Sequence, residues 1–91
     1  MGQEEDLDKL REKIDALDGE LLEALARRME VVAEIGRYKK ARGMELRDEE
    51  RLRALLAGQL DRAASLNLPK ELITELYELI HKYALRIENE A

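Results

Sequence analysis

The sequence predicts an all-α protein, and three observations lead to this class. Charged residues make up 41% of the 91 residues and aromatic residues only 3%, with no Trp or Phe, a balance typical of amphipathic helices. Apolar residues recur at alternating three- and four-residue steps, which is the period of a helix. The first 42 residues contain no proline. We expect a single domain over residues 1–91, built from one long, one short and one medium helix.

The long predicted helix runs from about Leu7 to about Arg42, and Gly43 is well placed to end it. Its apolar stripe consists of Leu10, Ile14, Leu17, Leu21, Ala24, Val31 and Ile35. At about 1.5 Å per residue the helix is roughly 50 Å long, too long for so small a monomer. Gly19 and Gly36 lie inside it, each costing about 1 kcal/mol relative to Ala. Packing must therefore hold this helix together, and close helix contact is one reason for a glycine.

Two further helices follow from capping signals and apolar periodicity. Asp48 is a good N-cap for a helix that runs to about Ala64. Pro69 suits the first position of a third helix, which extends to the end of the chain. The second helix places Leu52, Leu55, Leu56, Leu60 and Ala63 on one face, and the third places Ile73, Leu76, Tyr77, Ile80, Ala84 and Ile87.

Arg28 falls on the apolar stripe of the long helix. A buried guanidinium is costly unless it is paired, so it either binds an anion or forms an Arg–Glu pair between helices. Lys39, eleven residues later, lies on the same face about 16 Å along the axis. The two side chains could bracket a small dianion, although Lys39 could also be a solvated flank residue.

Arg11 is about 25 Å from Arg28 along the axis and about 100° round the helix. It is either a solvated residue or a contact to the same ligand from another subunit whose long helix runs antiparallel. The second interpretation predicts a homodimer in which dimerisation completes the site.

Several other classes of function are disfavoured. The net charge of −5 argues against nucleic acid or an anionic membrane as a partner. The acidic start has neither a signal peptide nor a membrane span, so a cytoplasmic protein is expected. Glu78 and His81 have the spacing of a helical di-iron motif, but His81 is the only histidine and we expect no metal site. No nucleophile motif supports covalent catalysis.

The charged residues occur in an order that resembles one known family. The stretches are residues 10–18, 27–28, 34–39 and 47–51. Together they resemble the all-helical chorismate mutases, and their spacing fits without a gap. The resemblance implies three helices per subunit in an intertwined dimer, with each active site formed mostly by one subunit and completed by one arginine of the other. It therefore implies that Arg11 crosses between subunits.

The resemblance also implies an isomerase that converts chorismate to prephenate in phenylalanine and tyrosine biosynthesis, without a cofactor. Arg28 and Arg11 would bind carboxylates and hold the reactive conformer. Lys39 would donate to the ether oxygen as negative charge grows there. Asp48 and Arg51 occupy positions near the mouth of the site and the substrate ring, while Ile35 and His81 are further candidates for lining the pocket.

Three positions depart from the better-known family pattern. Leu52 replaces a glutamate that receives the substrate hydroxyl, Ala84 replaces a common serine, and Glu88 stands where many members have glutamine. If Glu88 must be neutral to donate to the ether oxygen, kcat/KM falls as pH rises and Glu88→Gln flattens the profile. Isochorismate pyruvate lyase, which uses the same fold, is the alternative enzyme. A non-catalytic or designed dimeric helical scaffold is the alternative without activity.

Overall fold

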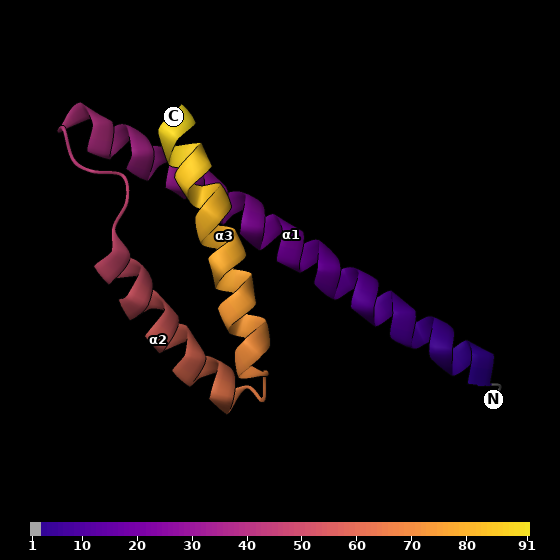
Figure 1. The fold of residues 1–91 in the computed structure, drawn as a ribbon. Helices are drawn as coiled ribbons and strands as arrows, with labels where there is room; N and C mark the ends of the chain where they lie inside the picture. Colours follow the sequence, from indigo (N-terminus) through magenta and orange to yellow (C-terminus); the bar gives the residue numbers. More distant parts are fainter. Residues whose placement is uncertain (1–2) are drawn as a thin grey trace. The chain divides into compact units, whose positions relative to one another are not determined.

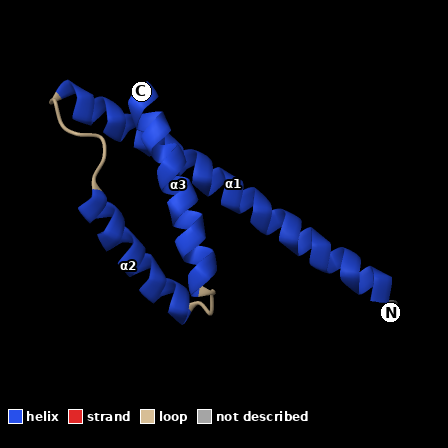
Figure 2. Ribbon diagram, in the orientation of Figure 1, coloured by secondary structure: helices blue, strands red, loops and turns tan. Residues whose placement is uncertain are grey.

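The computed structural model describes residues 3–91, with side chains from residue 6 onward. This part of the chain contains three α-helices and no strand (Figure 2). The predicted all-α class is therefore confirmed. The described residues divide into two compact units, one ending at Val31 and the other formed by Val32–Ala91.

Helix α1 (Gln3–Ala41) supplies all of the described part of the first unit and the beginning of the second. It begins four residues before the predicted Leu7, because the acidic residues 4–6 suit the positive end of a helix. In the first unit the apolar stripe is solvent-exposed: Leu17 and Leu21 keep 62% and 63% of their surface. One chain alone does not give this stripe a core.

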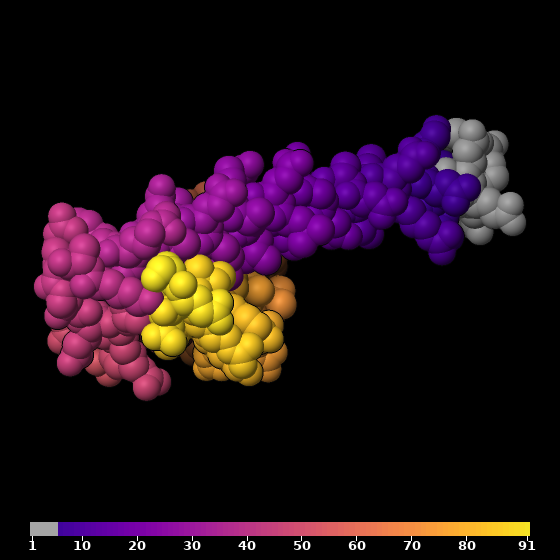
Figure 3. Space-filling model, turned by 90° about the horizontal axis from the view of Figure 1, so that it is seen from above, coloured from indigo at the N-terminus to yellow at the C-terminus, as the bar shows by residue number. Residues whose placement is uncertain are grey.

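The second unit contains residues 32–41 of α1 together with helices α2 (Glu49–Ser65) and α3 (Lys70–Glu90). Helices α2 and α3 lie side by side and antiparallel, joined by a short loop (Figure 1). The end of α3 lies beside the end of α1, and Lys40 of α1 donates to the backbone carbonyls of Asn89 and Ala91 (Figure 3). The unit is thus a helical hairpin whose last turn is attached to α1.

Helices α1 and α2 are each followed by a residue with a left-handed backbone conformation. Gly43 has a φ of 64° and Asn67 a φ of 59°, a region that glycine and asparagine tolerate best. After each of them the next N–H reaches back to a carbonyl of the last turn, from Met44 to Lys39 at 2.8 Å and from Leu68 to Ala63 at 2.9 Å. This is the Schellman motif, and it confirms Gly43 as the stop signal.

Helix α3 begins one residue later than predicted. Pro69 is its N-cap rather than its first helical residue, with φ −62° and ψ 135°. The extended ψ takes Pro69 out of the helical region, while its carbonyl still accepts the first bond of the helix, from the Ile73 N–H at 3.3 Å. Proline is therefore found at the start of α3, as predicted, but it occupies the N-cap and not the first helical position.

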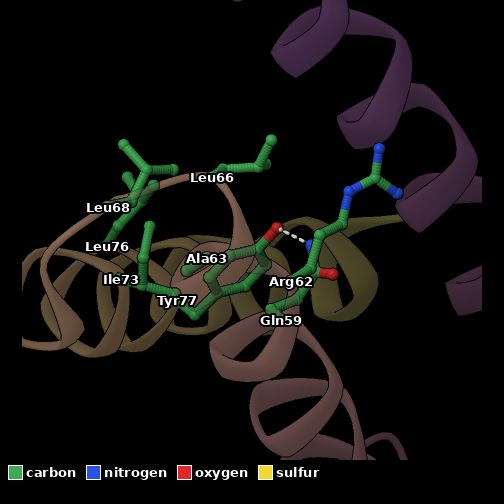
Figure 4. A pocket seen from close by; sticks show the side chains of 8 residues that line it. All are labelled: Gln59, Arg62, Ala63, Leu66, Leu68, Ile73, Leu76 and Tyr77. Atoms are coloured by element: carbon green, nitrogen blue, oxygen red, sulfur yellow. Dashed lines mark hydrogen bonds between the residues drawn. The ribbon is translucent and has the colours of Figure 1, made fainter.

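The apolar core of the described chain is small. Its buried apolar residues are Val32, Ala63, Ile73 and Ala84. A mostly apolar pocket lies between α2 and α3 near their loop, where Gln59 donates to the Tyr77 hydroxyl at 2.5 Å (Figure 4). Leu66, Leu68 and Leu76 border this pocket and remain 58%, 42% and 39% exposed. Within residues 3–91, no helix has the length and apolar character needed to cross a membrane.

Candidate functional site

A lysine and a buried glutamate form the centre of the candidate site. The Lys39 Nζ lies 3.2 Å from Oε1 of Glu88 and donates a hydrogen bond to it. Their side chains keep only 17% and 9% of their surface exposed. Because little water screens this pair, its mutual attraction is stronger than that of a surface ion pair. The structure thus brings together two residues that are 49 positions apart in the sequence.

The ammonium of Lys39 has a second partner. Its Nζ donates to the Leu46 carbonyl at 2.8 Å, so the lysine also fixes the segment that leads from α1 into α2. An ammonium has three N–H donors, and these two contacts use two of them. One donor is left to meet a ligand oxygen, as judged from the contacts of the described residues.

Three candidate residues share one face of α3. His81, Ala84 and Glu88 are spaced three and four residues apart and so lie one above another along the helix. Ala84 and Glu88 are buried, and His81 is partly buried. Within the described chain the Nε2 of His81 is buried without a hydrogen-bond partner. An unsatisfied buried nitrogen on this face is suited to a polar ligand atom.

The start of α2 holds the three candidates Asp48, Arg51 and Leu52. Asp48 is the N-cap: its Oδ1 accepts the Arg51 N–H at 3.0 Å, and its carbonyl accepts the Leu52 N–H at 3.1 Å. The predicted capping role of Asp48 is therefore confirmed. Leu52 is partly buried, as expected for a member of the apolar face, and Arg51 is exposed.

The remaining candidates lie on α1. Ile35 belongs to the second unit and is 42% exposed. Arg28 belongs to the first unit, and its Nη1 is buried with no hydrogen-bond partner among the described residues. The ion pairs found in this part of the chain do not include Arg28, so the predicted alternative of an Arg–Glu pair is not observed. Arg11 is exposed, and its Nη1 lies 4.0 Å from Oδ1 of Asp8.

Lys40 is a residue that sequence reasoning missed. Its ammonium donates to the Asn89 carbonyl and, at 2.8 Å, to the Ala91 carbonyl, directly after Glu88. One signal could have indicated this role: the last turn of α3 carries no basic residue of its own, so a cation from another helix is needed there. A helix C-terminus attracts a cation, and here Lys40 of α1 supplies it.

The described residues therefore define a helical protein with cationic and uncompensated donor groups suited to an anionic ligand. Among them no cluster of His, Cys, Asp and Glu is arranged to hold a metal ion. The chemistry that such a site supports is the binding and polarisation of oxygen atoms.

Residues 10–89 match the family described as chorismate mutase type II. The chain belongs to this family. The match covers α2 and most of α1 and α3, and it includes each of the candidate residues named above.

Similar proteins fall into two groups by length. The T-protein of Enterobacter agglomerans is 34% identical over 85 residues, which cover 93% of this chain but 23% of that protein. The bifunctional chorismate mutase/prephenate dehydratase of Escherichia coli is 40% identical over 80 residues, or 88% of this chain and 21% of that protein. The 4-amino-4-deoxychorismate mutase of Streptomyces venezuelae is 30% identical over 89 residues, which cover 98% of this chain and 86% of that protein. The chain thus spans about a quarter of the first two relatives and most of the third.

Proposed function

We propose that this chain is a chorismate mutase, an isomerase that rearranges chorismate to prephenate in the biosynthesis of phenylalanine and tyrosine. The observation that carries the proposal is the buried Lys39–Glu88 pair in a chain that matches the family over residues 10–89. The rearrangement breaks a C–O bond and forms a C–C bond within one molecule. It requires no nucleophile, and the proposal includes no cofactor.

In this proposal Lys39 donates to the ether oxygen of the substrate. Negative charge grows on that oxygen as the C–O bond breaks, and a fixed ammonium stabilises it more in the transition state than in the ground state. The contacts to Leu46 and Glu88 support the assignment, because they hold the ammonium in place before the substrate arrives. Pre-positioning removes the cost of reorganising the donor during the reaction.

Arg28 and Arg11 are proposed to bind the two carboxylates of the substrate. The Nη1 of Arg28 supports this role, because it is buried without a hydrogen-bond partner among the described residues and a carboxylate would supply the missing acceptor. Arg11 is proposed to reach the site from a second copy of the chain. The axial distance of about 25 Å between the two arginines on one helix supports such a crossing.

The other assignments concern the lining of the site. We propose Asp48 and Arg51 at its mouth and Ile35, Leu52, His81 and Ala84 around the substrate ring. The partly buried state of Leu52 and His81 and the burial of Ala84 support an enclosed lining. The organisation of the chain as one domain over residues 1–91 and its cytoplasmic location stay predictions.

We further propose that the chain is a homodimer with α1 shared between the two copies. The exposed stripe of α1 supports this proposal, because apolar surface of this extent is removed from water only by a partner. The exposed leucines beside the α2–α3 pocket offer a second apolar surface for such a contact.

One assay tests the enzymatic proposal. The purified chain is mixed with chorismate, and loss of chorismate and formation of prephenate are followed for the wild type, Arg28→Ala and Arg27→Ala. We expect turnover by the wild type and a loss of about 100-fold in kcat/KM for Arg28→Ala, the typical effect of removing one transition-state donor. Arg27→Ala is the matched control, since the neighbouring arginine is exposed, and it should retain activity.

The same assay includes isochorismate and 4-amino-4-deoxychorismate. The second compound is included because a relative covered over 86% of its length is a 4-amino-4-deoxychorismate mutase. Faster conversion of the amino compound would reassign the substrate. Conversion of isochorismate with release of pyruvate would indicate the lyase, and no turnover of any of the three would favour the non-catalytic scaffold.

A further inference from the structure

The backbones of α1 and α3 meet at Gly36 and Glu88. A Cβ atom added at Gly36 would lie 2.6 Å from the Cα of Glu88 and 2.7 Å from its carbonyl oxygen. Ordinary contacts of a Cβ begin near 3.4 Å, and backbone atoms cannot move away by changing a rotamer. Any side chain at position 36 must therefore push the two helices apart or shift one along the other.

A second contact holds the end of α3, just after Glu88. The Lys40 ammonium donates to the carbonyls of Asn89 and Ala91, which lie at the end of α3. The last carbonyls of a helix have no partner within the helix, and they carry its negative partial charge. A lysine from α1 therefore satisfies them and attaches this end of α3 to α1.

The Lys39–Glu88 pair lies directly beside both contacts. On α1, Lys39 stands between Gly36 and Lys40, and on α3 the residue that touches Gly36 is Glu88 itself. We propose that Gly36 and Lys40 are positioning residues, which fix the separation and register of α1 and α3 so that Glu88 meets Lys39. This inference rests on the proposed function for its effect on catalysis, but not for its effect on the ion pair.

The expected size of the effect follows from the geometry. Relief of the overlap at position 36 requires the helices to separate by about 1 Å, the difference between 2.6 Å and an ordinary contact. With both side chains in their present conformations, a displacement of this size takes the 3.2 Å bond between Lys39 and Glu88 beyond hydrogen-bonding distance. Errors of about 1 Å in the placement of a catalytic group reduce rates by as much as 100-fold.

The first experiment compares Gly36→Ala with Gly58→Ala in the full chain. Gly58 is the matched control because a Cβ there meets no atom within 4 Å. We expect Gly36→Ala to lower kcat about tenfold or more, with a smaller change in KM, and Gly58→Ala to leave kcat within about twofold. In a Glu88→Ala background, Gly36→Ala should cause little further loss, because its effect passes through the Glu88 side chain. An equal loss in both backgrounds would overturn the proposal.

A second readout needs no activity. The coupling between Lys39→Met and Glu88→Gln is measured by a double-mutant cycle on urea unfolding, at one fixed chain concentration. We expect coupling between Lys39 and Glu88 in the wild-type background and no coupling in the Gly36→Ala background. If the wild type converts none of the substrates, the proposed function fails while this cycle still decides the positioning role. Undiminished coupling would contradict it.

If Gly36→Ala does not fold, Lys40→Met provides the test. The Lys40→Met substitution adds no atom between Gly36 and Glu88, where the two helices touch. Its control is Lys82→Met, which removes an exposed ammonium of α3 that lies 5.8 Å from the centre of the Tyr83 ring. We expect Lys40→Met to lower kcat about threefold relative to Lys82→Met and to weaken the coupling between Lys39 and Glu88. Equal kcat and equal coupling in the two variants would overturn the positioning role.

Discussion

Glu88 is a charged residue that is buried beside apolar residues of the small core. It is 6% exposed, and its carboxylate accepts from the ammonium of Lys39 at 3.2 Å. An ionised carboxylate only accepts hydrogen bonds, as an ether oxygen does. Glu88 therefore holds Lys39 in place, but its carboxylate cannot itself donate to the proposed substrate oxygen.

Glu88→Gln should supply the missing donor at this position. The amide keeps the size of the side chain and adds an N–H donor for the ether oxygen at any pH. We expect kcat/KM of the variant to exceed that of the wild type several-fold at neutral pH, because the added donor stabilises the charge that grows on the ether oxygen. The check is kcat/KM at neutral pH for the wild type and the variant, with Glu90→Gln, an exposed residue of the same helix, as control. Equal kcat/KM for the wild type and Glu88→Gln would remove Glu88 from the reaction.

At the scale of elements, the positions where helices start and stop follow from local chemistry. Asp48 at the start of α2 and Gly43 at the end of α1 were readable from the sequence, because capping depends on residue type and near neighbours. The start of α3 was displaced by one residue, since proline is compatible with both N-cap and first position. The contact between Lys39 and Glu88 was not readable in this way. It depends on how α3 crosses α1, and a single sequence carries no direct signal for that crossing beyond a glycine in mid-helix.

Two substitutions of Asp48 measure how much its N-cap contributes to the free energy of unfolding, independently of its proposed role at the site. Asp48→Ala removes the acceptor of the Arg51 N–H and should lower the free energy of unfolding by about 1 kcal/mol. Asp48→Asn keeps an equally good cap, so its unfolding should stay close to that of the wild type. Urea unfolding at equal chain concentration measures both changes. Similar losses in the two variants would show that the charge of Asp48, and not its cap, supports α2.

At the scale of the whole molecule, the apolar surface exceeds what one chain buries. Within the described part of the chain, no side chain is completely buried, whereas the stripe of α1 presents leucines that are more than half exposed. This imbalance was predictable from the length of the helix. The surface that covers the stripe was not, because the pairing of two chains is not encoded in the period of one helix.

Leu17→Glu tests the proposed dimer. Burial of a leucine contributes about 1.5 kcal/mol or more, and a two-fold dimer contains it twice. We expect the dissociation constant to rise at least about 100-fold, as measured by sedimentation equilibrium. Ala26→Glu is the control, since residue 26 is exposed and lies on the opposite side of α1. A wild type that sediments as a monomer would contradict both the dimer and the crossing of Arg11.

The exposed stripe of α1 also has a consequence for how such a chain behaves as its amount varies. If two copies complete each site, the fraction of working sites depends on total protein by mass action. Specific activity would then decline on dilution, and freshly made chains would contribute nothing until each had found another. The abundance of the protein would itself set a threshold for the proposed reaction.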